Sequence, residues 1–440
     1  MQRYFHSLAD FGTAALRGKE VLLLNWRGES SDFCRFNHAK VRQAGHVDQR
    51  TLVVRLIDGG KQAVSTLSLA GKRDEDERRL TATVAKMREQ LPFVPADPHL
   101  LYATEIKSSE KLTRKGTLDG AALASDILTA GQGQDLVGIL AVGAVERGFA
   151  NSLGQRNWYQ TESYNFDWSI YSSTDKAVKC GYAGYDWSRA ELDRKMGEAR
   201  HSLEIVGRPA KIVQPGKYRA YLAPAALREM ISLLSWGGFG LKANRTKQSC
   251  LNKLIAGEET LSPKISMSEA VAEGISPDFD TFGFRKPTHV SLINKGKYAD
   301  ALVSARSSKE YNVATTGADE GESPESFAMA PGGLRQADAL QRLGTGFWIN
   351  NLWYLNFSDR NVCRMTGMTR FATYWVEDGV PVAPVNVMRF DDSVFRVLGT
   401  TLEDLTIERD FIMSADTYVE RSTSSHHMPG ALIGEMTFTL

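Results

Sequence analysis

The stretch Thr51–Leu69 reads TLVVRLIDGGKQAVSTLSL and contains two runs of β-branched and apolar residues separated by Asp58-Gly59-Gly60. Glycine reaches the positive φ angles that a tight hairpin turn requires. The stretch therefore predicts two antiparallel strands, Thr51–Leu56 and Ala63–Leu69, joined by this turn. The run Glu20–Trp26 has a similar composition and predicts a further strand. We expect the chain to begin with an antiparallel sheet.

Helical periodicity follows this sheet. Apolar residues recur at helical spacing in Asp74–Gln90, and Thr117–Ala130 also has a helical period. Ser188-Arg189-Ala190-Glu191 fits a capping box and predicts the start of a helix over Ser188–Ile205. The strand Tyr218–Leu222 should lead into a helix over Ala225–Trp236, because Pro224 precedes this segment and Gly237-Gly238 ends it.

Further short strands are predicted where apolar and polar residues partly alternate or aromatic residues cluster. They are Gly143–Phe149, Arg156–Glu162, Phe166–Ser172, Thr288–Asn294 and Phe347–Asn356. The segment Thr315–Gln336 is rich in Gly, Pro, Ser and acids, and we expect a long, partly disordered loop that is either functional or a solvated connector. The fold class should be α+β, with an N-terminal sheet-and-helix domain at 1–205 followed by a mainly β C-terminal domain at 206–440 that carries the helix 225–236.

The composition is that of an ordinary globular protein. The 440 residues include 53 Lys and Arg against 52 Asp and Glu, so no strong positive field would attract nucleic acid or an anionic membrane. The first twenty residues contain no continuous apolar segment of the signal-peptide type. The most apolar stretch, Leu136–Val145, has about half of the roughly 20 residues that span a bilayer. We expect a cytoplasmic protein.

The sequence offers little metal or nucleophile chemistry. The four cysteines are far apart and form no CxxC pair, so we expect reduced and mostly buried thiols. No two histidines lie four residues apart, and we see no GxSxG or phosphate-loop motif. His38 and His46 are weak ligand candidates. The adjacent pair His426-His427 is the most tempting metal site, although neighbouring residues of an extended chain point to opposite faces.

The most distinctive stretch is Gly344–Asp359, GTGFWINNLWYLNFSD, in which aromatic residues interleave with Asn350, Asn351 and Asn356. Aromatic and amide side chains together can line a peptide groove. A buried strand would give the same pattern. The candidate peptide contacts are Trp348, Asn350, Trp353, Tyr354 and Asn356.

Taken together, the motifs resemble the TldD/PmbA family, known for microcin maturation and once described as modulators of DNA gyrase. The resemblance runs from about residue 10 to the end of the chain. It rests on the order and spacing of several segments: Arg147–Glu162, Tyr218–Lys253, Ser262–Gly317, Leu343–Leu355, Thr366–Gly379 and Met428–Leu440.

Active chains of the TldD branch carry a HExxxH motif on the core helix, with a Cys near the C-terminus as third zinc ligand. This chain reads LREMISLLSW at 227–236 and has no Cys in Thr417–His427. The resemblance is therefore to the PmbA (TldE) branch. It implies a non-catalytic subunit that forms a heterodimer with a TldD-like catalytic chain and holds peptide substrates, with zinc supplied by that partner and no cofactor in this chain.

Two alternatives remain open from the sequence. The chain could be a peptidase in its own right with a non-standard metal site at His426 and His427, or a binding or regulatory protein without a proteolytic role. The sequence also leaves open whether the chain forms a homodimer when it is alone.

Overall fold

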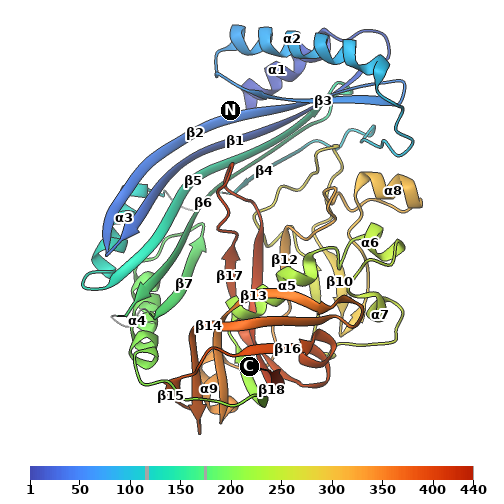
Figure 1. Cartoon of the computed structure of the whole chain (residues 1–440). Coiled ribbons are helices and arrows are strands. Elements are labelled where there is room, and N and C mark those ends of the chain that lie inside the picture. Colours follow the sequence, from blue (N-terminus) through green and yellow to red (C-terminus); the bar gives the residue numbers. More distant parts are fainter. Residues whose placement is uncertain (114–117, 173–175, 440) are drawn as a thin grey trace.

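A computed structural model describes residues 1–113, 118–172 and 176–439, and two β-sheets organise them (Figure 1). The first sheet is antiparallel except for the parallel pair β4–β6. Across the sheet its strands are β3 (Lys61–Ser68), β2 (Lys40–Asp58), β1 (Val21–Asn37), β5 (Asp135–Asn151), β6 (Arg156–Tyr171) and β4 (Ser109–Thr113), and β7 (Ala177–Gly184) also pairs with β6.

The hairpin turn at Gly59-Gly60 is confirmed, since both glycines have positive φ angles, 55° and 77°, between β2 and β3. The prediction of short strands is wrong for this sheet. Strands β1 and β2 have 17 and 19 residues, and the segments Arg156–Glu162 and Phe166–Ser172 belong to the single strand β6. The added part of β2, residues 40–50, is polar and mostly exposed, whereas the added part of β1, residues 27–37, mixes polar residues with the buried Cys34 and Phe36. Pairing of the backbones extends β2 where no alternation of apolar residues predicts a strand.

Four helices cover one face of the first sheet. They are α1 (Gln2–Ala14), α2 (Arg73–Gln90), α3 (Gly120–Ala130) and α4 (Arg189–Val206). Side chains alternate across each strand, so Trp26 and Phe36 of β1 and Phe166 of β6 lie in the cores under these helices. The opposite face of the sheet curves over the second half of the chain (Figure 1).

Helix α4 begins where the sequence predicts. The Ser188 side chain accepts a hydrogen bond from the backbone N–H of Glu191 at 3.3 Å. The reciprocal half of the capping box is absent, because the Ser188 N–H donates to the Tyr182 hydroxyl and Glu191 pairs with Arg194. Residue 117, at the expected start of the helix that became α3, lies outside the described residues, and Asp119 caps α3.

The second sheet is built from the second half of the chain. It contains β8 (Gly216–Leu222), β9 (Met267–Glu269), β10 (Val290–Asn294), β11 (Lys297–Tyr298), β12 (Ser326–Met329), β13 (Gly346–Asp359), β14 (Arg364–Glu377), β15 (Val380–Pro384), β16 (Arg389–Ser393), β17 (Leu402–Met413) and β18 (Ser425–Phe438). Strand β8 pairs with both β13 and β18, which closes the ring β8–β13–β14–β16–β18.

Helix α5 (Pro224–Ser235) follows β8 directly and packs its apolar side against this sheet. Its position confirms the strand-to-helix prediction around Pro224. The other short helical segments are α6 (Leu241–Arg245), α7 (Asn252–Ile255), α8 (Ala305–Tyr311) and α9 (Ala339–Leu343), with single turns η1 (Leu91–Phe93), η2 (Gln336–Asp338), η3 (Arg360–Val362) and η4 (Arg396–Thr400).

The segment Thr315–Gln336 is a loop over most of its length, as predicted, but the expectation of a loop throughout is wrong. This segment contains β12, which lies inside the second sheet between β9 and β18. The buried Glu269 carboxylate accepts hydrogen bonds from the N–H groups of Glu325 and Ser326, both at 3.0 Å. Tertiary pairing therefore orders a segment whose composition is that of a loop.

The α+β fold class is confirmed, with sheet and helices first and a mainly β part after them. The boundary at 205/206 stays a prediction, because α4 packs against β7 of the first sheet and also against β14 and β15 of the second. The four cysteines are free, and Cys34, Cys250 and Cys363 are buried. Among the described helices, none combines the length and the apolar character needed to cross a bilayer.

Candidate functional site

A cavity lies between the helix-free face of the first sheet and three elements of the second half: α5, the β13–β14 hairpin and the residues after β17. It consists of three adjoining hollows of about 380, 350 and 350 Å³. Lys179 lines all three, Asp167 lines the first two, and Trp353 lines the first and the third. We call it the inter-sheet cavity. Volumes of this order suit a bound small molecule or a few residues of a peptide.

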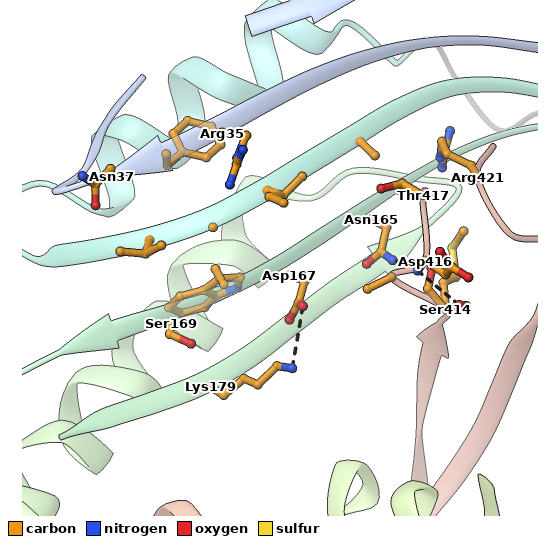
Figure 2. A pocket seen from close by; sticks show the side chains of 18 of the residues that line it. Arg35, Asn37, Asn165, Asp167, Ser169, Lys179, Ser414, Asp416, Thr417 and Arg421 are labelled. Atoms are coloured by element: carbon orange, nitrogen blue, oxygen red, sulfur yellow. Dashed lines mark hydrogen bonds and ion pairs between the residues drawn. The ribbon is translucent and has the colours of Figure 1, made fainter. Parts of the chain in front are cut away.

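The floor of the cavity comes from the first sheet (Figure 2). Asn165 and Asp167 of β6 and Lys179 of β7 lie on the face opposite the helices, as strand alternation requires. The Lys179 ammonium is 3.7 Å from the Asp167 carboxylate. Burial raises the pKa of Asp167 above its usual value, while Lys179 acts in the opposite direction.

The loop 414–424, which joins β17 to β18, forms another wall, and we call it the strap. The buried Arg421 anchors it to the first sheet: its guanidinium donates to the Gly143 carbonyl at 3.1 Å and to the Ser163 hydroxyl at 2.9 Å. Asn165 donates to the Ser414 carbonyl at 3.0 Å. A further cavity of about 450 Å³ also adjoins the strap. The strap therefore has a fixed place between two hollows.

Helix α5 presents two charged side chains to the cavity. Leu227, Met230 and Ile231 are buried in the core, so the helical period leaves Arg228 and Glu229 on the side that lines the hollow. The two side chains form an ion pair with each other. This is the helix on which the resemblance places the zinc motif of active relatives.

The residues at this position do not fit a zinc ion. Zinc sites require about three neutral or anionic ligands such as His, Cys or carboxylate. The cavity side of α5 supplies one carboxylate, already paired with a guanidinium. Within residues 1–113, 118–172 and 176–439, His, Cys, Asp and Glu side chains form no group of three or more that could hold a metal.

The two adjacent histidines of β18 diverge. The His426 ring lies 5.9 Å from that of Phe327, and burial together with the Arg228 guanidinium lowers the pKa of His426 to about 3. The His427 ring packs 4.7 Å from Phe411, and its Nε2 is 3.2 Å from the Glu273 carbonyl oxygen. The structure therefore does not bring the two rings together. His38 and His46, the weaker candidates, pair separately with Asp135 and Asp32.

The aromatic stretch is split between core and cavity. Trp348 is 9% exposed, stacks on Tyr221 with ring centroids 4.2 Å apart, and donates to Asn350. Trp348 therefore belongs to the packed interior of the sheet, and Asn350 is half-buried beside it. Trp353 and Tyr354 are 39% and 80% exposed and line the cavity. The exposed Asn356 does not line the cavity, and its side chain accepts the N–H of Phe357.

Two β-bulges explain this division. The register of β13 against β14 shifts between Ile349 and Asn351 and again between Trp353 and Asn356. Tyr354 and Phe371 adopt φ angles of 57° and 59° there, which bulky residues rarely do. Bulges redirect side chains. The Arg370 guanidinium lies 5.4 Å from the centre of the Trp353 ring, so the cavity wall combines aromatic faces with a cation.

Several cavity residues are not found by sequence reasoning alone. Asn351 belongs to the aromatic stretch, but the sequence does not show that it lines two of the hollows. The bulge places it there and leaves its buried Oδ1 without a hydrogen-bond partner. Lys179 and Arg421 lie in segments with no motif. The β-bulges carry no glycine that would mark them in the sequence.

Comparison with known proteins agrees with this geometry. Residues 215–440 match the family model described as the PmbA/TldA metallopeptidase C-terminal domain. None of the curated proteins matches. Solved structures with the same fold include TldE from Thermococcus kodakarensis, with a TM-score of 0.78, 12% identity, and coverage of 99% of this chain and 100% of that one.

Two further solved structures are similar, and both are named as modulators of DNA gyrase. The Thermotoga maritima protein has a TM-score of 0.76 at 12% identity and covers 99% of each chain. The Bacteroides thetaiotaomicron protein has a TM-score of 0.76 at 15% identity, with coverage of 99% of this chain and 98% of that one. Identities this low show the fold alone.

The family match spans more than half of the 440 residues, and the chain therefore belongs to the PmbA/TldD family of metallopeptidase-related proteins.

Proposed function

We propose that this chain is the non-catalytic, peptide-holding subunit of a heterodimeric TldD/TldE-type zinc metalloprotease. In this account a TldD-like partner supplies the zinc ion and the catalytic glutamate. The present chain contributes the inter-sheet cavity, which holds unfolded or extended peptides. We place the complex in the cytoplasm.

One observation carries the proposal. The cavity side of α5 holds the ion pair Arg228–Glu229, whereas hydrolysis by a zinc peptidase requires a metal-bound water beside a general base. The Glu229 carboxylate is already paired with the positively charged Arg228, so it is poorly suited to bind zinc or to act as the general base. The cavity around it is nevertheless large and has both polar and aromatic walls.

The lining of the cavity suits an extended peptide. Peptide backbones need hydrogen-bond partners as well as flat apolar surfaces. Asn165 and Asn351 offer side-chain amides on opposite sides of the hollow, and Trp353 offers a partly exposed aromatic ring. This arrangement supports binding of a chain without demanding a single side-chain sequence.

The test is co-purification of this chain with the TldD-like protein of the same organism, followed by cleavage of an unstructured peptide. We expect a stable complex and cleavage by the complex but not by this chain alone. Failure to form a complex and to increase cleavage would favour the regulatory alternative. Cleavage by this chain alone, with stoichiometric zinc, would favour the reading as a peptidase in its own right.

A further inference from the structure

Two arginines meet at one end of the inter-sheet cavity. Arg35 of β1 pairs with Gln43 of β2, whereas the next residue, Phe36, pairs with Val41. Arg42 is therefore the extra residue of a β-bulge. A bulge turns a side chain toward the face that its neighbours occupy, and both Arg35 and Arg42 line the same hollow.

The charges of this hollow do not balance. Its described walls include the cations Arg35, Arg42, Lys179 and Arg421 but only two carboxylates, Asp167 and Asp416. Asp167 is paired with Lys179. Neither Arg35 nor Arg42 forms an ion pair with any residue that the structure describes. The hollow is left with an excess of positive charge.

The buried Arg421 has a carboxylate beside it. It is 3% exposed, and its guanidinium donates to the neutral oxygens of Ser31, Gly143 and Ser163. Its backbone N–H donates to the Glu29 carboxylate at 3.1 Å. The Glu29 carboxylate therefore lies beside Arg421 and offsets part of its charge, because charges in a poorly solvated site interact strongly. The unbalanced positive charge of the hollow rests on Arg35 and Arg42.

Apolar groups lie beside these cations. Val137 and Ile139 of β5 are 37% and 40% exposed on the face that carries Arg35, and Ile139 is paired with Arg35 across the strands. Trp353 and Phe371 form the facing wall. Figure 2 shows Arg35 and Arg421 at two places around this hollow, with Asp167 and Lys179 joined between them. A ligand here should carry both a negative charge and apolar side chains.

We infer that this hollow binds a carboxylate of the extended peptide, either the chain-terminal carboxylate or an Asp or Glu side chain, through Arg35 and Arg42. Guanidinium groups bind carboxylates with two parallel hydrogen bonds. The apolar residues next to that carboxylate then pack on Val137 and Ile139. This inference rests on the proposed function, because it assumes that the cavity holds a peptide.

The test measures binding of fluorescent unstructured peptides to the full-length chain by polarisation. Three peptides of one apolar-rich sequence are compared: one with a free C-terminal acid, one with a C-terminal amide, and an amide peptide with one internal Asp. We expect a carboxylate to tighten binding at least tenfold over the plain amide, by an amount that falls with added salt. Tighter binding of the C-terminal acid or of the internal-Asp peptide shows whether the site binds the chain-terminal carboxylate or a side-chain carboxylate.

Variants assign the effect to the two arginines. The double substitution Arg35→Gln with Arg42→Gln should remove the advantage of the carboxylate peptide, so that the acid and amide peptides bind with similar affinity. Arg78→Gln changes an exposed arginine of α2 that does not line the cavity, and it should have no effect. Urea unfolding midpoints equal to wild type would show that the double variant is folded.

Two outcomes would overturn the inference separately from the proposed function. Equal binding of acid and amide peptides by wild type, or equal weakening of both by the double variant, would refute the carboxylate site while peptide holding stands. Absence of binding for all three peptides would refute the proposed function, and this inference with it.

Discussion

At the scale of single residues, Arg421 joins the two halves of the chain. Its guanidinium satisfies oxygens of β1, β5 and β6 from a position on the strap. Removal of this guanidinium leaves several buried oxygens without donors, and each unsatisfied buried group costs about 1–3 kcal/mol.

Arg421→Gln should therefore lower the free energy of unfolding by about 2–4 kcal/mol, as measured by urea denaturation. Arg27→Gln is the matched control, because Arg27 also contacts the strap but its side chain is 47% exposed. That change should cost at most about 1 kcal/mol. Equal effects of the two substitutions would show that the buried anchor does not stabilise the junction.

Glu269 gives the stability a pH dependence at the residue scale. Its carboxyl is 6% exposed, and burial raises its pKa to about 7, with Lys286 opposing and Glu325 adding to the shift. Burial likewise raises the pKa of Asp280 to about 6. At these two carboxyls the folded chain keeps protons that the unfolded chain loses between about pH 4.5 and 7, so their contribution to stability falls as pH rises through this window. His426 opposes them, because burial lowers its pKa to about 3 and the unfolded chain therefore binds a proton there that the folded chain does not.

Glu269→Gln should remove the Glu269 part of this pH dependence. Its Oε1 can still accept the backbone N–H groups, so we expect the unfolding free energy of the variant to rise by roughly 1–3 kcal/mol relative to that of wild type between pH 5 and 7.5. The pH dependence that remains should combine the opposing contributions of Asp280 and His426. Glu258→Gln, at an exposed carboxylate, is the control. An unchanged slope in Glu269→Gln would contradict the assignment.

At the scale of elements, two register shifts interrupt the regular pairing of the β13–β14 hairpin where it forms the cavity wall. A bulky residue at positive φ costs of order 1–3 kcal/mol, and Tyr354 and Phe371 both adopt this conformation. Tyr354 is 80% exposed, so packing of its side chain offsets little of this conformational strain. This combination indicates that the side chain serves the cavity and not the core.

Tyr354→Gly should separate stability from binding. Glycine relieves the strain but adds backbone entropy to the unfolded chain, so the unfolding free energy should stay within about 1 kcal/mol of wild type. Affinity for unstructured peptides should fall by roughly threefold to tenfold with the loss of an aromatic contact. Phe93→Gly, at an exposed aromatic that does not line the cavity, should leave affinity unchanged. A large loss of stability with unchanged affinity would assign Tyr354 to the fold instead.

The elements also show what can be predicted from the sequence. Helices α4 and α5 were predictable because Ser188, Pro224 and Gly237 are local signals at their ends. The second half of β1 was not, because polar residues there occupy buried and exposed positions alike, although burial partly alternates. The first half of β2 was not, because its side chains are mostly exposed and only pairing with neighbours defines it. Strand β12 was missed for the same reason, since its ordering depends on Glu269 and on β18.

At the scale of the whole molecule, the cavity exists only in the tertiary structure. Arg35, Lys179, Glu229, Trp353 and Ser414 come from five regions of the chain and converge only after folding. Of the expected peptide contacts, Trp353 and Tyr354 line the cavity. The sequence could not separate them from Trp348, because a bulge and not a residue type decides which aromatic side chain faces the cavity.

For the whole complex, we propose that catalysis resides in the partner and that this chain holds the peptide. The decisive measurement is the rate at which the assembled pair cleaves an unstructured peptide when the glutamate of the partner's HExxxH motif is replaced by Gln and this chain is unchanged. We expect a loss of roughly 10²–10⁴-fold, the usual contribution of a general base. Cleavage at the rate of the wild-type pair would show instead that the chemistry belongs to this chain.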